Sequence, residues 1–277
     1  MNFEILKKYG IKAKKSLGQN FLIDENILDT IASTLDIAEK NVLEIGPGYG
    51  ALTEKLLELK PKSLHLVELD KEMIEILEKR KENGELNVVS VDFQIFNKDV
   101  LKFEPKFEDE EYYVIANIPY YITSPILQKF LYKIENKPEK MLILMQKDVG
   151  DKILQGQNIK NKKNKSSVLS LFIAKKAYVN EIIKVSANCF VPAPKVESSA
   201  LLFETHDNYR ETDDLKFLEF IKVGFQEPRK KLVNNLSKGG YEKSNLLKIF
   251  DDLGFKEDIR GEDLSIDEWV EVYRKCL

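Results

Sequence analysis

The feature that most constrains the fold is a glycine-rich turn between an apolar strand and an amphipathic helix. Val42–Ile45 predicts a buried strand, residues 46–50 read Gly-Pro-Gly-Tyr-Gly, and Ala51–Leu59 carries leucines at helical spacing. A second apolar run ends in Glu68 and Asp70, roughly 20 residues after the glycines. This order is typical of a nucleotide-binding βαβ unit, in which glycines admit a ligand to the backbone and the acid binds ribose hydroxyls.

The turn itself disfavours a dinucleotide. Its third glycine is displaced from the dinucleotide fingerprint, and Pro47 removes a backbone N–H that a diphosphate would use. S-adenosylmethionine, which has an adenosine ribose and no diphosphate, fits this turn better than NAD.

Further apolar runs at 112–116 and 141–145, separated by a helical stretch at 127–132, predict a doubly wound α/β sheet. Ligands of such sheets bind at the carboxyl ends of the strands. Four polar or glycine positions fall there: Gly46, Glu68, Asp99 and Asn117.

The tetrapeptide Asn117-Ile118-Pro119-Tyr120 suits chemistry on an adenine amine. That amine is a poor nucleophile because its lone pair is delocalised into the ring. The Asn117 side-chain oxygen and the Ile118 carbonyl can accept its two N–H bonds and localise the lone pair. Pro119 stiffens the turn, and Tyr120 offers an aromatic face to the base.

Placed after Glu-Ile-Gly-Pro-Gly-Tyr-Gly, this tetrapeptide makes the chain resemble the KsgA family of ribosomal RNA adenine N6,N6-dimethyltransferases. Ser16–Asp24, Phe190–Ser199, Arg229–Leu236 and Gly261–Ser265 also look like motifs of that family. The resemblance implies a Rossmann-like class I S-adenosylmethionine-dependent methyltransferase sheet with a small C-terminal all-helical domain. It implies methyl transfer to N6 of two adjacent adenines in the 3′-terminal hairpin loop of small-subunit (16S) rRNA, within a 30S precursor.

Carried over residue by residue, the resemblance also implies roles for individual side chains. Asn20 and Leu22 should line the amino-acid and ribose region of the cofactor, and Gly46 should lie beneath the cofactor. Glu68 should bind the ribose hydroxyls and Asp99 the adenine amine of the cofactor. Asn117 should lie between the methyl donor and the target base, and Tyr120 and Phe190 should stack on the two faces of that base.

Two stretches leave questions open. Asp92 is an alternative to Asp99, although Gln94–Lys98 resembles the strand that precedes the adenine-binding acid in the family. Asn158–Lys165 is rich in lysine where the family commonly carries a Tyr-Gly-Arg, so these lysines are candidate phosphate contacts.

Composition shifts after Phe203, and the polar stretch 205–214 is a candidate linker. We therefore expect a catalytic domain over 1–205 and a helical domain over 206–277. In the latter, Ser265 and Glu268 form a capping box before an apolar stripe that begins at Trp269 and is expected to be core.

The net charge of −3 hides local basic clusters. Local potential governs phosphate binding, so the expected RNA contacts are Lys14, Lys15, Arg229, Lys230 and Lys231. Two cysteines and two histidines predict neither a metal site nor a disulfide framework. With no membrane span or signal peptide readable, we expect a cytoplasmic monomer.

Three other classes remain. Antibiotic-resistance methylases of large-subunit rRNA share two of these motifs, but the acidic pI and the Arg229–Leu236 motif favour the small-subunit enzyme. A non-catalytic ribosome-assembly factor with the same fold is disfavoured by the intact Gly46, Glu68, Asn117 and Tyr120. An NAD-dependent dehydrogenase is disfavoured by the glycine pattern.

Overall fold

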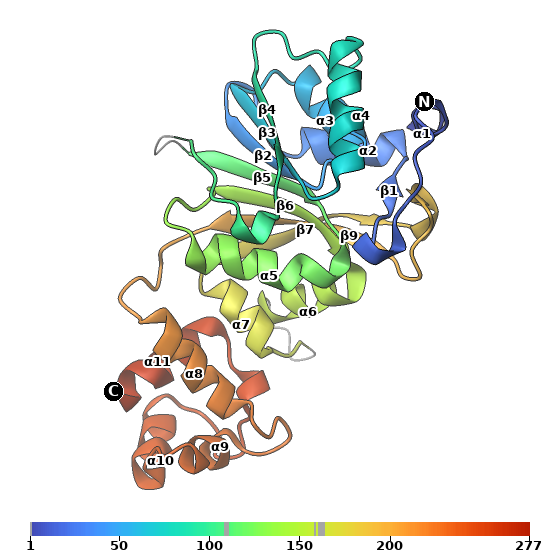
Figure 1. Cartoon of the computed structure of the whole chain (residues 1–277). Helices are drawn as coiled ribbons and strands as arrows, with labels where there is room; N and C mark the ends of the chain where they lie inside the picture. The colour runs from blue at the N-terminus through green and yellow to red at the C-terminus, as the bar shows by residue number, and fades with distance from the viewer. Residues whose placement is uncertain (1, 108–110, 158, 160–163) are drawn as a thin grey trace. The chain divides into compact units, whose positions relative to one another are not determined.

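The computed structural model describes residues 2–107, 111–157, 159 and 164–277. Its contacts divide the chain into two compact units, one comprising residues up to 150 together with 180–204 and the other 151–179 together with 205–277 (Figure 1). The sequence placed residues 151–179 in the catalytic domain. By contacts they group with the carboxyl-terminal residues, because Leu171 packs into the helical core there.

The first unit is built on a seven-stranded sheet of order β4-β3-β2-β5-β6-β9-β7 (Figure 1). The strands are β2 (Asn41–Ile45), β3 (Ser63–Glu68), β4 (Asp92–Asn97), β5 (Tyr112–Asn117), β6 (Lys140–Gln146), β7 (Ala177–Val185) and β9 (Ser198–Thr205). The pairs from β4 through β6 are parallel, and β9 runs antiparallel to β6. The expected doubly wound sheet is therefore present.

Helices and short turns connect these strands. They are α1 (Asn2–Lys8), η1 (Lys15–Leu17), α2 (Glu25–Ser33), α3 (Ala51–Glu58), α4 (Lys71–Glu82), η2 (Val100–Lys102), η3 (Tyr120–Ile122), α5 (Thr123–Gln128), the π-helical η4 (Lys129–Lys133), α6 (Lys147–Gln157) and η5 (Ala187–Cys189).

The central strands read as apolar runs because both of their faces are covered. Leu64, Leu66 and Ile115 pack against residues of α2, α3 and α4 on one face. The intervening residues, such as Val67 and Val114, are also buried and point to the opposite face, since side chains alternate along a strand. The carboxyl ends of β2, β3, β4 and β5 consequently meet at one edge of a rigid sheet.

A second, two-stranded sheet forms a separate wall beside that edge. In it β1 (Phe21–Leu22) pairs antiparallel with β8 (Phe190–Val191), so that Leu22 lies opposite Phe190. Residues almost 170 positions apart in sequence are thereby brought together.

The second unit has a helical core. Its helices are α7 (Val168–Ala174), α8 (Asp214–Gly224), α9 (Leu232–Lys238), α10 (Lys243–Asp252), η6 (Gly261–Asp263) and α11 (Ile266–Cys276). The predicted capping box is confirmed: Ser265 and Glu268 bond each other's backbone N–H groups at the start of α11. Trp269 is fully buried and donates its indole N–H to the Gly261 carbonyl, so the predicted stripe is core.

Candidate functional site

A cavity of about 320 Å³ opens at the carboxyl ends of β2, β3 and β5, within the first unit. This volume lies in the range of about 300–1,000 Å³ that small-molecule sites occupy. All ten residues predicted for the cofactor and the chemistry line it: Asn20, Leu22, Gly46, Glu68, Asp99, Asn117, Ile118, Pro119, Tyr120 and Phe190. The structure therefore brings together residues that are scattered over 170 positions of sequence.

The glycine turn forms the floor of this cavity. Gly46 has a φ of +71°, a backbone conformation that residues with a side chain rarely adopt. A Cβ at this position would also lie 2.9 Å from the Asn117 carbonyl oxygen. Glycine is thus required on two grounds, and the ends of β2 and β5 approach closely as a result. Pro47 is buried at the turn.

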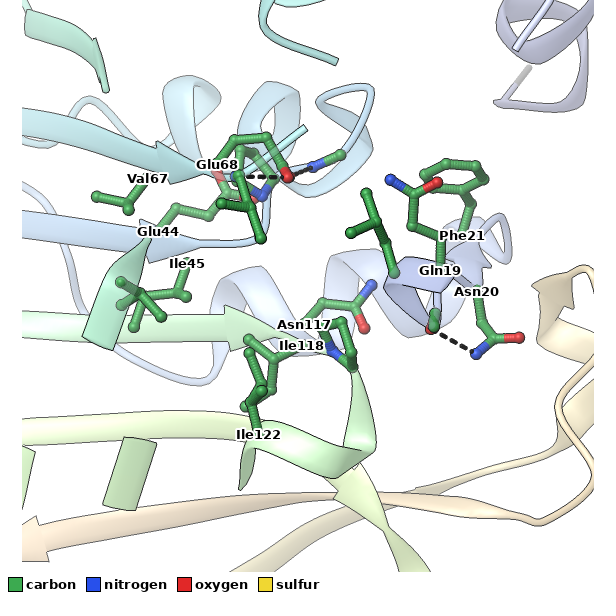
Figure 2. A pocket seen from close by; sticks show the side chains of 18 of the residues that line it. Gln19, Asn20, Phe21, Glu44, Ile45, Val67, Glu68, Asn117, Ile118 and Ile122 are labelled. Atoms are coloured by element: carbon green, nitrogen blue, oxygen red, sulfur yellow. Dashed lines mark hydrogen bonds between the residues drawn. The ribbon is translucent and has the colours of Figure 1, made fainter. Parts of the chain in front are cut away.

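Glu68 lies at the end of β3 and faces the cavity (Figure 2). One of its oxygens accepts the N–H groups of Leu69 and Asp70 at 2.8 and 2.9 Å, and the other accepts the N–H of Gly48 at 3.2 Å. Burial raises the pKa of Glu68, and these three backbone bonds offset only part of that effect. Its carboxyl group is therefore held in one orientation and keeps acceptor capacity toward a ligand.

The structure separates the two aspartates that the sequence left as alternatives. Asp99 follows β4 and lines the cavity, with one oxygen accepting the Leu101 N–H at 2.9 Å. Asp92 begins the same strand and bonds His65 and Gln94 instead. Since β4 is six residues long, Asp92 lies at the opposite end of the strand from the cavity.

Asn117 ends β5, and Figure 2 shows its side chain directed into the cavity. Within the described residues this amide has no hydrogen-bond partner, so both its oxygen and its nitrogen are available. Tyr120 is tied down differently: its hydroxyl bonds the buried Ser198 hydroxyl at 2.7 Å, which fixes the ring plane beside the cavity. Burial raises the pKa of Tyr120, so it stays a neutral phenol.

The opposite wall comes from the amino-terminal segment and the β1–β8 pair. Asn20 lines the cavity, and its side-chain NH₂ group donates to the Gly18 carbonyl at 3.1 Å, so its amide oxygen has no partner among the described residues. Phe190 lines this wall but is only 3% exposed, because its ring packs in the hydrophobic core. Tyr121, at the mouth, is 63% exposed.

Glu44 is a functional candidate that the sequence reading passed over. It lines the cavity, is 1% exposed and accepts a bond from the Thr53 hydroxyl at 2.7 Å. Burial raises its pKa to about 8, with a smaller contribution from the nearby Glu68. A glutamate inside an otherwise apolar strand is the sequence signal that could have identified it.

The charges around the cavity test which cofactor fits. Three carboxyl groups line it, those of Glu44, Glu68 and Asp99, together with one lysine, Lys98. With a pKa of about 8, Glu44 is protonated at neutral pH, so the carboxyl groups that give the lining its acidic character are those of Glu68 and Asp99. An acidic lining disfavours a diphosphate and favours a ligand with cationic groups, such as the sulfonium and ammonium of S-adenosylmethionine. The buried Pro47 likewise offers no N–H to a phosphate. The residues present therefore fit S-adenosylmethionine.

Comparison with known proteins supports this geometry. A sequence profile described as "Ribosomal RNA adenine dimethylase" matches residues 10–276. The chain belongs to the ribosomal RNA adenine dimethylase family. S-adenosylmethionine is accordingly its expected cofactor.

Curated relatives of this family member are similar over nearly their whole length. Proteins named "Ribosomal RNA small subunit methyltransferase A" are 38% identical in Mycoplasma mobile, over 92% of this chain and 94% of the relative, and 40% identical in Alkaliphilus oremlandii, over 96% and 92%. The resemblance inferred from the motifs is confirmed.

Solved structures show the same fold. A dimethyladenosine transferase from Plasmodium falciparum superposes with a TM-score of 0.76 at 24% identity, covering 92% of this chain and 98% of that one. The 23S rRNA methyltransferase ErmE superposes with a TM-score of 0.71 at 20% identity, covering 93% and 99%. The expected class I methyltransferase architecture is thus confirmed.

The five basic residues that are expected to contact RNA differ in whether a carboxylate already pairs with them. Lys15, Arg229 and Lys230 are exposed and have no ion-pair partner among the described residues. Lys14 is paired with Asp70 and Glu72, and Lys231 with Glu257 at 3.1 Å. RNA contact by any of the five stays a prediction.

Not every polar residue near these basic clusters is available to RNA. Asn235, within the Arg229–Leu236 motif, is buried and donates to the carbonyls of Gly224 and Glu227, so it is part of the core. In the lysine-rich stretch, Lys165 pairs with Glu262 and Asp263, whereas Lys160, Lys162 and Lys163 lie outside the described residues.

Two searches of the described residues gave negative results. Within residues 2–107, 111–157, 159 and 164–277, no three His, Cys, Asp or Glu side chains are grouped closely enough to hold a metal ion. None of the helices described there is long and apolar enough to cross a membrane.

Proposed function

We propose that this chain transfers methyl groups from S-adenosylmethionine to N6 of two adjacent adenines in the 3′-terminal hairpin loop of small-subunit rRNA. The observation that carries the proposal is the unpaired Asn117 amide, which faces the same cavity as Gly46, Glu68 and Asp99. Family membership and relatives named for the small subunit support the reaction and the RNA.

In this proposal the carboxyl ends of β2, β3 and β4 hold the cofactor. Glu68 accepts bonds from the ribose hydroxyls, because its orientation is fixed by three backbone N–H groups. Asp99 keeps one oxygen free to accept a bond from the adenine amine. Gly46 underlies the cofactor, and Asn20 and Leu22 cover its amino-acid and ribose region. When bound, S-adenosylmethionine supplies an electrophilic methyl group on a sulfonium.

Asn117 and Ile118 activate the target nitrogen. The Asn117 side-chain oxygen and the Ile118 carbonyl accept its two N–H bonds, which pulls the nitrogen toward tetrahedral geometry and localises its lone pair. These acceptors are preorganised at the end of a buried strand, so little reorganisation is needed when charge develops. After methylation the nitrogen carries an extra proton, which is acidic and passes to water, so the reaction requires no side chain as a general base.

Tyr120 and Phe190 are proposed to hold the extruded base. The ring of Tyr120 is fixed by Ser198, and Pro119 sets the turn before it. A base taken out of its stack needs aromatic cover on its faces. Phe190 lines the same cavity and is proposed to supply the second face; since it is only 3% exposed, its ring must become accessible when the base enters.

The partner is rRNA within a 30S precursor, bound by a monomer in the cytoplasm. Lys15 and Arg229 are the cations best placed for phosphate contact, because they have no competing carboxylate among the described residues. Lys230 is also exposed, but Glu227 lies close enough to interact with its charge. Lys14 and Lys231 would have to exchange their present carboxylate partners for phosphate.

The test is to map dimethylated adenines in unmodified small and large ribosomal subunits after incubation with the protein and S-adenosylmethionine. Two adjacent dimethyladenines near the 3′ end of small-subunit rRNA are expected. Modification of the large subunit alone would favour the antibiotic-resistance class, and binding without methyl incorporation would favour an assembly factor. Calorimetry with S-adenosylmethionine and NAD should show binding of the former only.

A further inference from the structure

The Asp70 carboxylate does not line the cavity, but it connects the wall that carries Glu68 with the wall formed by the amino-terminal segment. Asp70 directly follows the loop of Glu68 and is the N-cap of α4, where it accepts the Glu72 N–H at 3.1 Å. Its side chain is only 3% exposed. The same carboxylate accepts two further bonds, one from the Lys14 ammonium at 2.6 Å and one from the Gln19 amide at 2.8 Å.

The segment that reaches Asp70 is residues 14–20, which includes the cavity-lining Leu17, Gly18, Gln19 and Asn20. Gln19 is used at both ends of its amide, because its oxygen accepts the Lys14 N–H at 2.8 Å. The Lys14 ammonium also pairs with Glu72 at 2.9 Å. Among the described residues, every polar contact of this segment with the rest of the chain goes to Asp70 or Glu72.

The segment is also in contact with the catalytic tetrapeptide. A Cβ at Gly18 would lie 3.2 Å from the ring of Tyr121 and 3.3 Å from the Pro119 side chain. Residues 14–20 therefore touch the proposed target site on one side and are bonded to the ribose-binding loop on the other. Burial opposes ionisation of Asp70, but the bonds from Lys14, Gln19 and Glu72 outweigh it and lower its pKa, so the carboxylate stays charged.

We infer that Asp70 is a positioning residue that, through Lys14 and Gln19, holds residues 14–20 as a wall of the cofactor cavity. Its backbone N–H also orients Glu68, so one residue sets both the ribose acceptor and the segment that covers the ligand. The inference that this wall affects S-adenosylmethionine binding rests on the proposed function. The inference that Asp70 holds residues 14–20 in place is independent of it.

The variant Asp70→Asn isolates this role from helix capping. Asparagine caps helices as well as aspartate does, so α4 should be retained. Lys14 and the Glu72 N–H bond the same oxygen of Asp70, and Gln19 bonds the other. The asparagine that keeps the cap therefore turns its NH₂ group toward the Gln19 amide, and it leaves Lys14 with a neutral acceptor. Because charge-assisted hydrogen bonds are lost, we expect amide exchange in residues 14–20 of the ligand-free protein to become at least about tenfold faster. S-adenosylmethionine affinity should fall about tenfold, because the segment must be ordered when the ligand binds.

A second set of variants approaches the same bonds from the other side. Lys14→Met should reproduce both effects, and Lys14→Arg should restore most of the wild-type protection and affinity. Lys12→Met is the matched control, since Lys12 is an exposed lysine on the same stretch without a described partner, and it should change neither quantity.

The two measurements separate the possible failures. Unchanged exchange in both Asp70→Asn and Lys14→Met would overturn the positioning role. Faster exchange with unchanged S-adenosylmethionine affinity would overturn its link to the cofactor. If the wild-type protein bound no S-adenosylmethionine, the proposed function would fail, and the cofactor part of this inference with it, while the exchange data would still decide the role of Asp70 in holding the segment.

Discussion

Replacing Gly46 by alanine tests the close approach of β2 and β5 on which the proposed site depends. The added Cβ would lie 2.9 Å from the Asn117 carbonyl oxygen, and the backbone has φ +71°. Gly84 offers a matched control, because it has the same φ of +71° and a Cβ there would meet nothing within 4 Å. Comparing the two variants separates backbone strain from the steric push on Asn117.

The strain should be common to both variants. A left-handed conformation costs an L-residue about 1–2 kcal/mol, so Gly46→Ala and Gly84→Ala should each lose about that much stability. The push is specific to Gly46. Increasing the distance between the new Cβ and the Asn117 carbonyl oxygen from 2.9 Å to the ordinary 3.4 Å moves that carbonyl by about half an ångström. The carbonyl belongs to the backbone, so it cannot avoid the contact by changing a side-chain rotamer.

A displacement of 1 Å at a reacting centre can cost about 100-fold in rate. We therefore expect methyl transfer by Gly46→Ala to fall about 10- to 100-fold beyond that of Gly84→Ala. Urea unfolding measures the loss of stability that backbone strain causes in both variants. Single-turnover methylation of small subunits at saturating S-adenosylmethionine measures the loss of rate that the displacement of Asn117 causes in Gly46→Ala alone. Equal activity of the two variants would refute the argument that Gly46 sets the position of Asn117.

Three further predictions concern the acceptor, the buried acid and the RNA contacts. Asn117→Ala should keep S-adenosylmethionine affinity within a few-fold while methyl transfer falls about 100- to 1,000-fold, because the acceptor acts mainly in the transition state; parallel loss of affinity would contradict this role. Because the folded chain keeps a proton on Glu44 up to about pH 8, the free energy of unfolding should decrease by up to about 1.4 kcal/mol per pH unit between pH 4.5 and 8 and level off above; Glu44→Gln should flatten this slope, and an unchanged slope would refute it. Replacing Arg229 and Lys230 by alanine should reduce the slope of log affinity for rRNA against log salt by about one to two units, and an unaltered slope would exclude phosphate contact by this pair.

Local patterns predicted the elements around the site because the relevant signals are short-range. The apolar runs at 113–116 in β5 and 141–145 in β6 reflect burial on both faces, and Ser265 with Glu268 marked the start of α11 through bonds between residues three apart. The ends of parallel strands meet at one edge of a sheet, so the order of strands and polar residues in the sequence was enough to predict that Gly46, Glu68 and Asn117 lie together.

Other features depended on contacts between distant residues. Residues 151–179 group with the helical core because Leu171 packs there, and the local sequence of that stretch does not encode its partner. Lys14 and Lys15 are adjacent and chemically alike, yet Asp70 is buried beside Lys14 while Lys15 remains exposed. The choice between Asp92 and Asp99 required the register of β4, which places only Asp99 at the cavity.

The sequence by itself determined the βαβ unit, the strand-end residues and the family, because strand and helix periodicity, turn chemistry and motif spacing are properties of short segments. The tertiary structure decided which charges are free and which are paired, that the buried Glu44 lines the cofactor cavity, and that residues 14–20 are bonded to Asp70. The bonds of Lys14 and Gln19 to Asp70 join residues more than 50 positions apart in sequence, and the desolvation of a charged group depends on all of the elements that pack around it.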